Sequence, residues 1–158
     1  MPVIRIEVWV DAPPERCFDL SRSIDLHVHT SAATGETAVA GRTSGLIGLG
    51  EEVTWRARHL GVWQRLTTRI TELDRPARFR DSMVRGAFAR FDHDHWFEPS
   101  GGGTLMRETF DYAAPLGPLG RLAERIFLTR YMRAFLTGRA ATIKRVAESE
   151  EWRRFLAE

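Results

Sequence analysis

Alternation of apolar and polar residues over most of the chain predicts a β-sheet built from short strands. Such runs cover residues 3–10, 52–59, 62–73, 79–85, 88–98 and 104–113. Side chains alternate between the two faces of a strand, so each run offers one face to a core. The gaps between the last five runs are short, which forces neighbouring strands to be antiparallel. Glycines 101–103 supply a turn that should pair the last two runs as a hairpin.

Two short helices are expected between the first and second strands. Asp11 is an N-cap candidate, and the prolines that follow suit the first turn of a helix near residues 13–20. A second short helix is expected over residues 23–31. Residues 32–50 form a turn-rich passage with weak strand signals.

The end of the chain carries a long helical pattern over residues 119–147. Its apolar residues recur on one broad arc, whereas its charged residues lie mainly off that arc. Because no proline interrupts the stretch, we expect a helix of about 28 residues and roughly 40 Å in length. Phe127, Tyr131 and Phe135 belong to the apolar arc and are expected to face the core. Such a helix needs a large surface to cover.

Composition indicates one ordinary globular domain over residues 1–158. The chain is 43% hydrophobic and 28% charged, with a formal net charge of +2. Its arginines are scattered among acidic residues, so the basic patch expected of a nucleic-acid-binding protein is missing. The single cysteine, Cys17, excludes an internal disulfide framework and is expected to be a buried, inert thiol. We expect no nucleic-acid partner.

The N-terminal segment predicts a cytoplasmic protein. Pro2 leads directly into a strand-like run, without the basic and apolar regions of a secretory leader. No apolar run is long enough to cross a bilayer. We therefore expect a soluble protein without stable membrane insertion.

The strand near residues 88–98 carries the most informative chemistry. Phe91, His93, His95 and Phe97 occupy alternate positions, while the residues between and beside them are nearly all charged. The two histidines should therefore face the interior. Buried imidazoles are costly unless they are hydrogen-bonded, so this face is either a polar network in a core or the wall of a cavity.

The following strand offers an acidic partner to these histidines. Met106, Glu108, Phe110 and Tyr112 form its more apolar face and are expected to point inward. Glu108 would then lie opposite either His93 or His95, because the glycine-rich turn leaves the register open by about one pair.

Several further side chains have two possible roles. On the strand over residues 79–85, Asp81 and Arg85 share a face with Phe79, and either an internal ion pair or a ligand contact is compatible with that position. His27 and His29 do not share a helix face, so both are expected at the surface. Trp63 and Trp96 fall on outward faces, which could mark a homodimer or another partner surface.

This order of elements is similar to that of the helix-grip superfamily. The resemblance spans almost the whole chain and rests on residues 8–20, 50–59, 79–88, 91–97 and 102–104 and on the terminal helix. The superfamily includes START domains, Bet v 1-type allergens and polyketide cyclases, together called SRPBCC proteins, and bacterial members of cyclase/dehydrase type carry similar runs. The resemblance implies an α+β fold in which a curved antiparallel sheet of six to seven strands wraps one long C-terminal helix, with two short helices after the first strand.

The same resemblance implies a deep, mainly apolar cavity between sheet and helix that holds a small hydrophobic molecule, such as a lipid, a polyketide or an aromatic compound. The superfamily has no universal catalytic motif, so no catalytic residue is assigned. The residues expected to line the cavity are Trp55, Phe79, Phe91, His93, His95, Glu108, Phe110, Tyr112, Phe127 and Tyr131.

Three functions stay open from the sequence. The leading one is a non-enzymatic binding protein in which the histidines and Glu108 tie the sheet together or orient a polar group of the ligand. The second is a cyclase or dehydratase in which His93 or His95 is a general base and Glu108 its orienting partner. The third is a protein-interaction module that uses the outward tryptophans.

No metal and no cofactor is assigned from the sequence. A His-x-His strand can present two imidazoles to one ion, with Glu108 or His59 as a third ligand, but this spacing is common and unspecific.

Overall fold

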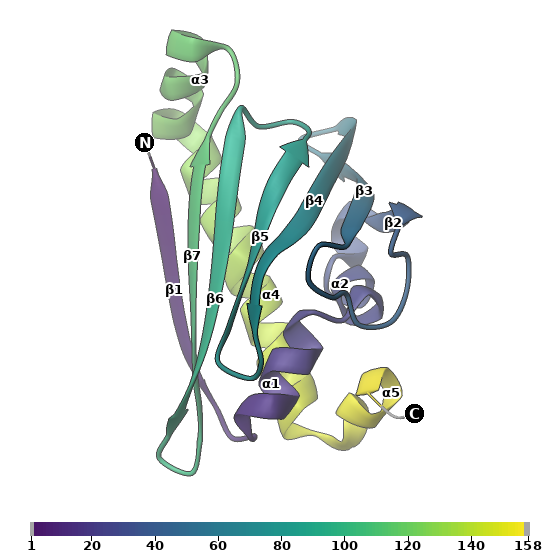
Figure 1. Ribbon diagram of the computed structural model, residues 1–158. Helices are drawn as coiled ribbons and strands as arrows, with labels where there is room; N and C mark the ends of the chain where they lie inside the picture. The colour runs from purple at the N-terminus through teal and green to yellow at the C-terminus, as the bar shows by residue number, and fades with distance from the viewer. Residues whose placement is uncertain (1, 157–158) are drawn as a thin grey trace.

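The computed structural model describes residues 2–156, which form one seven-stranded antiparallel sheet with helices on its concave face (Figure 1). The strands are β1 (Val3–Val10), β2 (Thr37–Gly41), β3 (Glu52–His59), β4 (Val62–Asp74), β5 (Arg78–Arg85), β6 (Arg90–Ser100) and β7 (Gly103–Ala113). Their order in the sheet is β1-β7-β6-β5-β4-β3-β2. Apart from β1, which returns to pair with β7, each strand lies beside its neighbour in the sequence.

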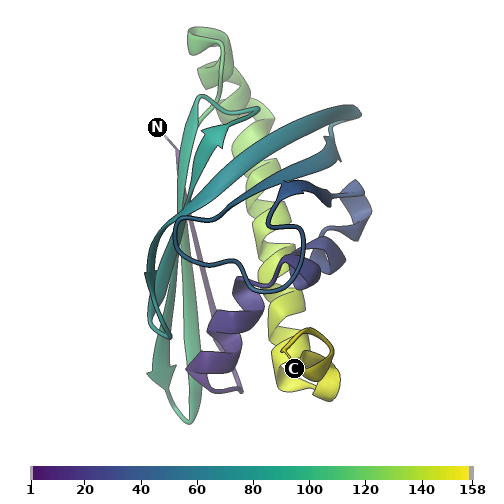
Figure 2. The ribbon, with the colours of Figure 1, turned by 45° about the vertical axis from the view of Figure 1, so that its right-hand side comes forward.

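The helices follow the expected order. They are α1 (Pro14–Ser21), α2 (Ile24–Thr30), the 3₁₀ turn η1 (Ala32–Thr34), α3 (Gly117–Ala123), the π-helical turn η2 (Glu124–Leu128), α4 (Thr129–Glu148), the 3₁₀ turn η3 (Glu150–Trp152) and α5 (Arg153–Leu156). The sheet curls around α4, as Figure 2 shows from the side. This arrangement is the helix-grip fold. No helix within residues 2–156 combines the length and the apolar character that crossing a membrane requires.

Bulges produce the curvature of the sheet. The register between β4 and β5 shifts at Thr67/Thr68 and again at Ile70/Glu72, and the β2–β3 pair shifts between Ala38 and Ala40. An extra residue on one strand bends it and increases its twist. The long strand β4 therefore sweeps across α4 (Figure 2).

The two short helices begin as their sequences suggest, with one difference. Ser23 caps α2 by accepting a hydrogen bond from the backbone N–H of Leu26 at 3.2 Å. Asp11 does not cap α1, because the helix starts later and the N-cap position belongs to Pro13, which has no side-chain acceptor. Pro14 takes the first helical position, where its missing N–H costs nothing.

Aromatic packing fills the end of the core under α1. The Phe18 ring stands edge-on to Phe79 and Phe97, with 5.4 Å between ring centroids in each pair. Cys17 beside it is fully buried, and burial raises the pKa of its thiol to about 11. The expectation of a buried cysteine is thus confirmed.

The long terminal helix departs from expectation at its start. It is continuous from α3 to α4, but its first part projects beyond the end of the sheet (Figure 1) and has no surface beneath it to cover. Leu119 is 70% exposed, Ile126 68% and Phe127 45%. The prediction that Phe127 faces the core is wrong, because the π-helical turn changes the direction of the apolar arc where the sheet ends.

The two outward tryptophans each lie against an arginine. Arg56 stacks on Trp63 with 3.9 Å from its guanidinium carbon to the ring centroid, and Arg78 approaches Trp96 at 5.7 Å. Such cation–π contacts account for part of their exposed aromatic surface. The homodimer and partner surface expected at these residues stays a prediction.

Candidate binding cavity and its polar end

A cavity of about 210 Å³ lies between the curved sheet and α4. Its wall is mainly apolar, and its apolar lining residues include Trp55, Leu66, Phe88, Phe91, Phe110, Tyr131, Met132, Phe135 and Leu136. At one end the lining comes from the turns β3–β4 and β5–β6 and from the segment after β7, through Leu60, Ala87 and Pro115. At the other end the wall is polar.

Five of the ten residues expected around the cavity line it: Trp55, Phe91, His93, Phe110 and Tyr131. Phe79 and His95 line a smaller adjoining hollow of about 50 Å³. Glu108 and Tyr112 point inward but lie behind the wall, where Glu108 bonds to His93 and the Tyr112 hydroxyl bonds to Thr129 at 2.7 Å. Phe127 is the exception, since it points away from the cavity.

His93 and Glu108 form the first polar contact of the site. In the hairpin register the residue directly opposite Glu108 is His95, yet the carboxylate reaches diagonally to His93, with 2.9 Å between Oε2 and Nε2. Burial opposes ionisation of Glu108, but the hydrogen bond from His93 and the charges of His95 and Arg139 outweigh it and lower the pKa to about 2. Glu108 is therefore an ionised acceptor, and His93 carries its proton on Nε2.

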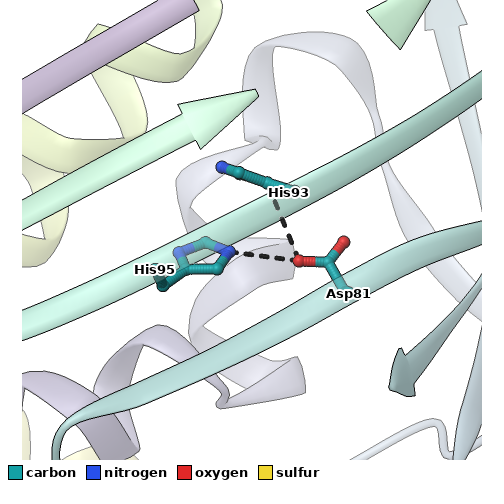
Figure 3. A group of neighbouring side chains, drawn as sticks. All are labelled: Asp81, His93 and His95. Carbon is teal, nitrogen blue, oxygen red and sulfur yellow. Dashed lines mark hydrogen bonds and ion pairs between the residues drawn. The ribbon is translucent and has the colours of Figure 1, made fainter. Parts of the chain in front are cut away.

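Asp81 brings a second carboxylate to the same place from β5 (Figure 3). Its Oδ1 lies 3.1 Å from Nε2 of His95 and 3.7 Å from Nδ1 of His93. Burial disfavours its charge, but the hydrogen bond from His95 and the neighbouring imidazoles lower its pKa. Burial and the nearby His93 lower the pKa of His95. The partners of Asp81 are thus the histidines, and the ion pair considered with Arg85 does not form.

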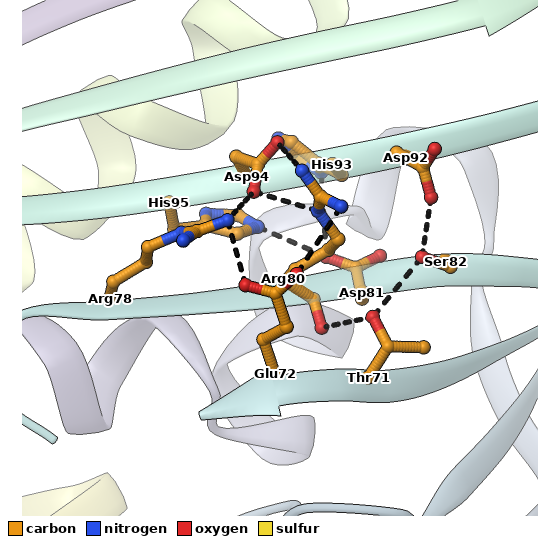
Figure 4. A network of polar contacts seen from close by, with 10 residues as sticks. All are labelled: Thr71, Glu72, Arg78, Arg80, Asp81, Ser82, Asp92, His93, Asp94 and His95. Atoms are coloured by element: carbon orange, nitrogen blue, oxygen red, sulfur yellow. Dashed lines mark hydrogen bonds and ion pairs between the residues drawn. The ribbon is translucent and has the colours of Figure 1, made fainter. Parts of the chain in front are cut away.

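The opposite face of the sheet holds these strands in place with a network of charges (Figure 4). Asp94 lies between the two histidines in sequence and points outward, where both of its oxygens accept hydrogen bonds from Arg80 at 2.8 and 2.9 Å. Arg78 donates to the same carboxylate at 3.0 Å and also pairs with Glu72 on β4. Bidentate arginine–carboxylate pairs fix geometry, so the strands that carry the inward histidines are tied together from behind.

A second polar cluster at this end was not expected from the sequence. His27 on α2 stacks on the Trp55 indole with 3.9 Å between ring centroids, and its Nε2 contacts a carboxylate oxygen of Glu36. Arg139 on α4 donates from Nη2 to Nδ1 of His27 at 2.7 Å. The prediction that His27 is exposed is wrong, whereas His29 is exposed as expected.

Charges within this cluster fix its protonation. Burial and the adjacent Arg139 guanidinium lower the pKa of His27, so the ring is neutral, accepts at Nδ1 and donates from Nε2 to Glu36. Burial opposes the charge on Glu36, but His27 and Arg139 lower its pKa. Nε of Arg139 is buried and has no hydrogen-bond partner among residues 2–156. This N–H is the unused donor at the polar end.

One sequence signal could have identified Arg139. It follows Tyr131 and Phe135 at intervals of four residues, so it continues the inward arc of the helix. Glu36 gave no such signal, because it lies in the turn-rich passage before β2.

His59 lies at the other end of the cavity. Its Nδ1 bonds to the Tyr131 hydroxyl at 2.7 Å, and the imidazole lines the wall there, away from His93 and His95.

Comparison with known families agrees with this geometry. The family model described as polyketide cyclase/dehydrase and lipid transport matches residues 1–148. The chain belongs to this family. The predicted SRPBCC membership is thereby confirmed, and no match was found among curated proteins.

Solved structures show the same fold for this family member. TTHA0849 from Thermus thermophilus superposes with a TM-score of 0.74 at 22% identity, covering 91% of this chain and 95% of the other. The major latex-like protein 151 from Panax ginseng gives 0.68 at 14% identity, with coverages of 94% and 98%. A START superfamily protein from Mycobacterium smegmatis gives 0.68 at 14% identity, with coverages of 92% and 97%. These likenesses establish the helix-grip fold.

Proposed function

We propose that this family member binds a small, mainly apolar molecule in the cavity between the sheet and α4. The observation that carries the proposal is the combination of an apolar wall with polar groups gathered at one end. Small-molecule pockets in proteins have this composition, since a few convergent polar groups orient a ligand that is otherwise held by apolar contact.

The volume limits the ligand. A dry protein cavity of about 150 Å³ holds one benzene molecule, and the cavity here measures about 210 Å³. A compound of one or two fused rings fits this space, whereas a sterol or a long acyl chain does not. We infer an aromatic or compact polyketide-like ligand.

The polar end defines how such a ligand would lie. Nε of Arg139 is a buried donor without a partner among the described residues, and the Asp81 carboxylate lies on the same part of the wall. A carbonyl or ionised phenol oxygen would accept from Arg139, while the ring system packs against Trp55 and Phe91. A buried donor that gains an acceptor recovers a penalty of about 1–3 kcal/mol.

A cyclase or dehydratase is the second candidate function, favoured by the position of His93 on the cavity wall. Glu108 accepts a hydrogen bond from Nε2–H of this ring, which leaves Nδ1 as the basic nitrogen. A general base must reach the proton it abstracts, and Nδ1 faces Asp81 at 3.7 Å. We therefore rank ligand binding above catalysis, because catalysis would need a ligand that enters between His93 and Asp81.

Native mass spectrometry followed by denaturation tests the binding proposal. A released molecule of one or two rings, or saturable binding of the bicyclic probe 2-naphthol, is the expected result. A protein that carries no molecule and fails to bind 2-naphthol or any other compound in a panel of mono- and bicyclic aromatics would refute the proposal. If the protein converts a bound carbonyl compound and His93→Gln abolishes this activity, the function is that of a cyclase or dehydratase.

A further inference from the structure

Three potential metal ligands converge at the polar end of the cavity. Asp81 on β5 is paired in register with His93 on β6, and His95 lies two residues further along the same strand face. One ligand atom from each of the three residues lies within 4.8 Å of the other two (Figure 3). We propose that Asp81, His93 and His95 form a binding site for a divalent transition-metal ion, with Zn²⁺ as the reference ion.

The observed spacing is close to what a tetrahedral centre needs. Zinc bonds to imidazole nitrogen and carboxylate oxygen at about 2.0–2.2 Å, so its ligand atoms stand about 3.3 Å apart. Oδ1 of Asp81 lies 3.1 Å from Nε2 of His95 and 3.7 Å from Nδ1 of His93. Nε2 of His95 donates a proton to Asp81 in the absence of metal, so an incoming ion displaces this proton, which moves to Nδ1 or to solvent. Small side-chain rotations of the two histidines then complete the ligand set. The ligand set differs from the one considered from the sequence, because Asp81 takes the place of Glu108 or His59.

Glu108 has the position of an outer carboxylate. Imidazoles that bind a metal through one nitrogen commonly donate the other N–H to a carboxylate, which fixes the tautomer and strengthens the ligand. Nε2 of His93 makes that bond to Glu108 at 2.9 Å, which leaves Nδ1, on the side of Asp81, as the nitrogen that can bind a metal.

The charges of the polar end also favour a cation. The carboxylates of Asp81, Glu108 and Glu36 gather there, and Arg139 is the cationic side chain that acts on all three. These three carboxylates outnumber the one guanidinium, so their charges attract a divalent ion to this end of the cavity. The metal site would also be exposed to ligand, because Asp81 and His93 line both the main cavity and the smaller hollow. An open coordination position would then face the bound molecule.

The strands that carry the ligands are rigid enough to preorganise the site. On the outer face, Asp94 is clamped by Arg80 and Arg78, and Ser82 donates to Asp92 at 2.6 Å (Figure 4). These contacts join β5 to β6 on both sides of His93. Sites built on fixed strands hold their ligands more accurately than sites on loops.

Calorimetric titration of chelator-treated, tag-free protein with Zn²⁺ tests the proposal. We expect one site per chain, at least about tenfold weaker in Glu108→Gln, and abolished in Asp81→Asn and His95→Gln. His29→Gln is the matched control, because it removes an exposed imidazole outside the cluster, and its affinity should equal that of the unaltered protein. Absence of Zn²⁺ binding, or binding unchanged in the folded ligand variants, would overturn the proposal.

A second measurement does not depend on the folding of any variant. In ¹⁵N spectra of the histidine side chains, Zn²⁺ should shift Nδ1 of His93 and Nε2 of His95 and leave His29 unchanged. Shifts at His29 alone would instead identify an adventitious surface site and refute the assignment. Both measurements are made without 2-naphthol, so the metal site and the binding function succeed or fail separately.

Discussion

Filling the cavity with protein should make this chain more stable while blocking its ligand. Ala57 on β3 is 4% exposed and lines the cavity, so the added atoms of Ala57→Leu would enter space of about 210 Å³. Leucine adds three carbons, which at about 0.8 kcal/mol each amounts to roughly 2.4 kcal/mol of apolar burial. Ordering the longer side chain offsets about 0.5–1 kcal/mol. We expect the free energy of unfolding to increase by about 1.5 kcal/mol.

Urea denaturation measures this change. With a denaturant slope of about 1–3 kcal/mol/M, the midpoint should rise by about 0.5–1.5 M without a change in slope. The same variant should bind 2-naphthol at least about tenfold more weakly, a loss of about 1.4 kcal/mol. Ala141→Leu is the control, because Ala141 is exposed on α4 and its replacement should change stability by less than about 0.5 kcal/mol.

The opposite result would refute the reasoning. If Ala57→Leu lowers stability by about 1–3 kcal/mol, as overpacking of a filled core does, the space beside Ala57 is not a cavity in solution. If stability rises but 2-naphthol binds as before, the cavity exists and the probe binds elsewhere.

Three further predictions concern pH, the aromatic core and a close backbone approach. Burial and Arg139 lower the pKa of His27 in the folded protein, so the unfolded chain binds more protons and the free energy of unfolding should fall as the pH drops below about 6.5. Urea titrations at several pH values should show that His27→Gln flattens this pH dependence and that His29→Gln does not. Phe18→Ala removes a fully buried ring from a tight aromatic cluster and should lower the free energy of unfolding by about 3–5 kcal/mol in the same assay. A smaller loss would show that neighbouring side chains move in to fill the space. Gly103→Ala would place a Cβ atom against the carbonyl oxygen of Val10 and should therefore lower the melting temperature. A melting temperature equal to that of the unaltered protein would contradict the β1–β7 geometry.

Strand alternation was enough to predict most of the strands and the inward face of two of them, whereas the fold and its cavity came from the resemblance to the helix-grip superfamily. The alternation identified the inward faces of β6 and β7, including His93, His95 and Glu108, because the two-residue period depends only on the local chain. It left the hairpin register open, and the structure resolves it by pairing His95 with Glu108 while the side-chain bond runs to His93.

The remaining parts of the site depend on contacts that local patterns do not encode. His27, Glu36 and Arg139 come from α2, the passage before β2 and α4, and they meet only because the sheet curls over the helix. Phe127 was misplaced for the converse reason. Its sequence pattern fits a regular α-helix, and that pattern shows neither the π-helical turn over Glu124–Leu128 nor the point where the sheet beneath the helix ends.

The alternation of side chains along β6 also limits which insertions and deletions this strand can tolerate. Asp92 and Asp94 stabilise the outer face while His93 and His95 serve the inner one, so insertion or deletion of a single residue upstream within the strand would exchange the two sets. Carboxylates would then face the cavity and imidazoles the arginines. We expect length variation among homologues to fall in the turns on either side of β6 and to leave the spacing within 91–97 intact.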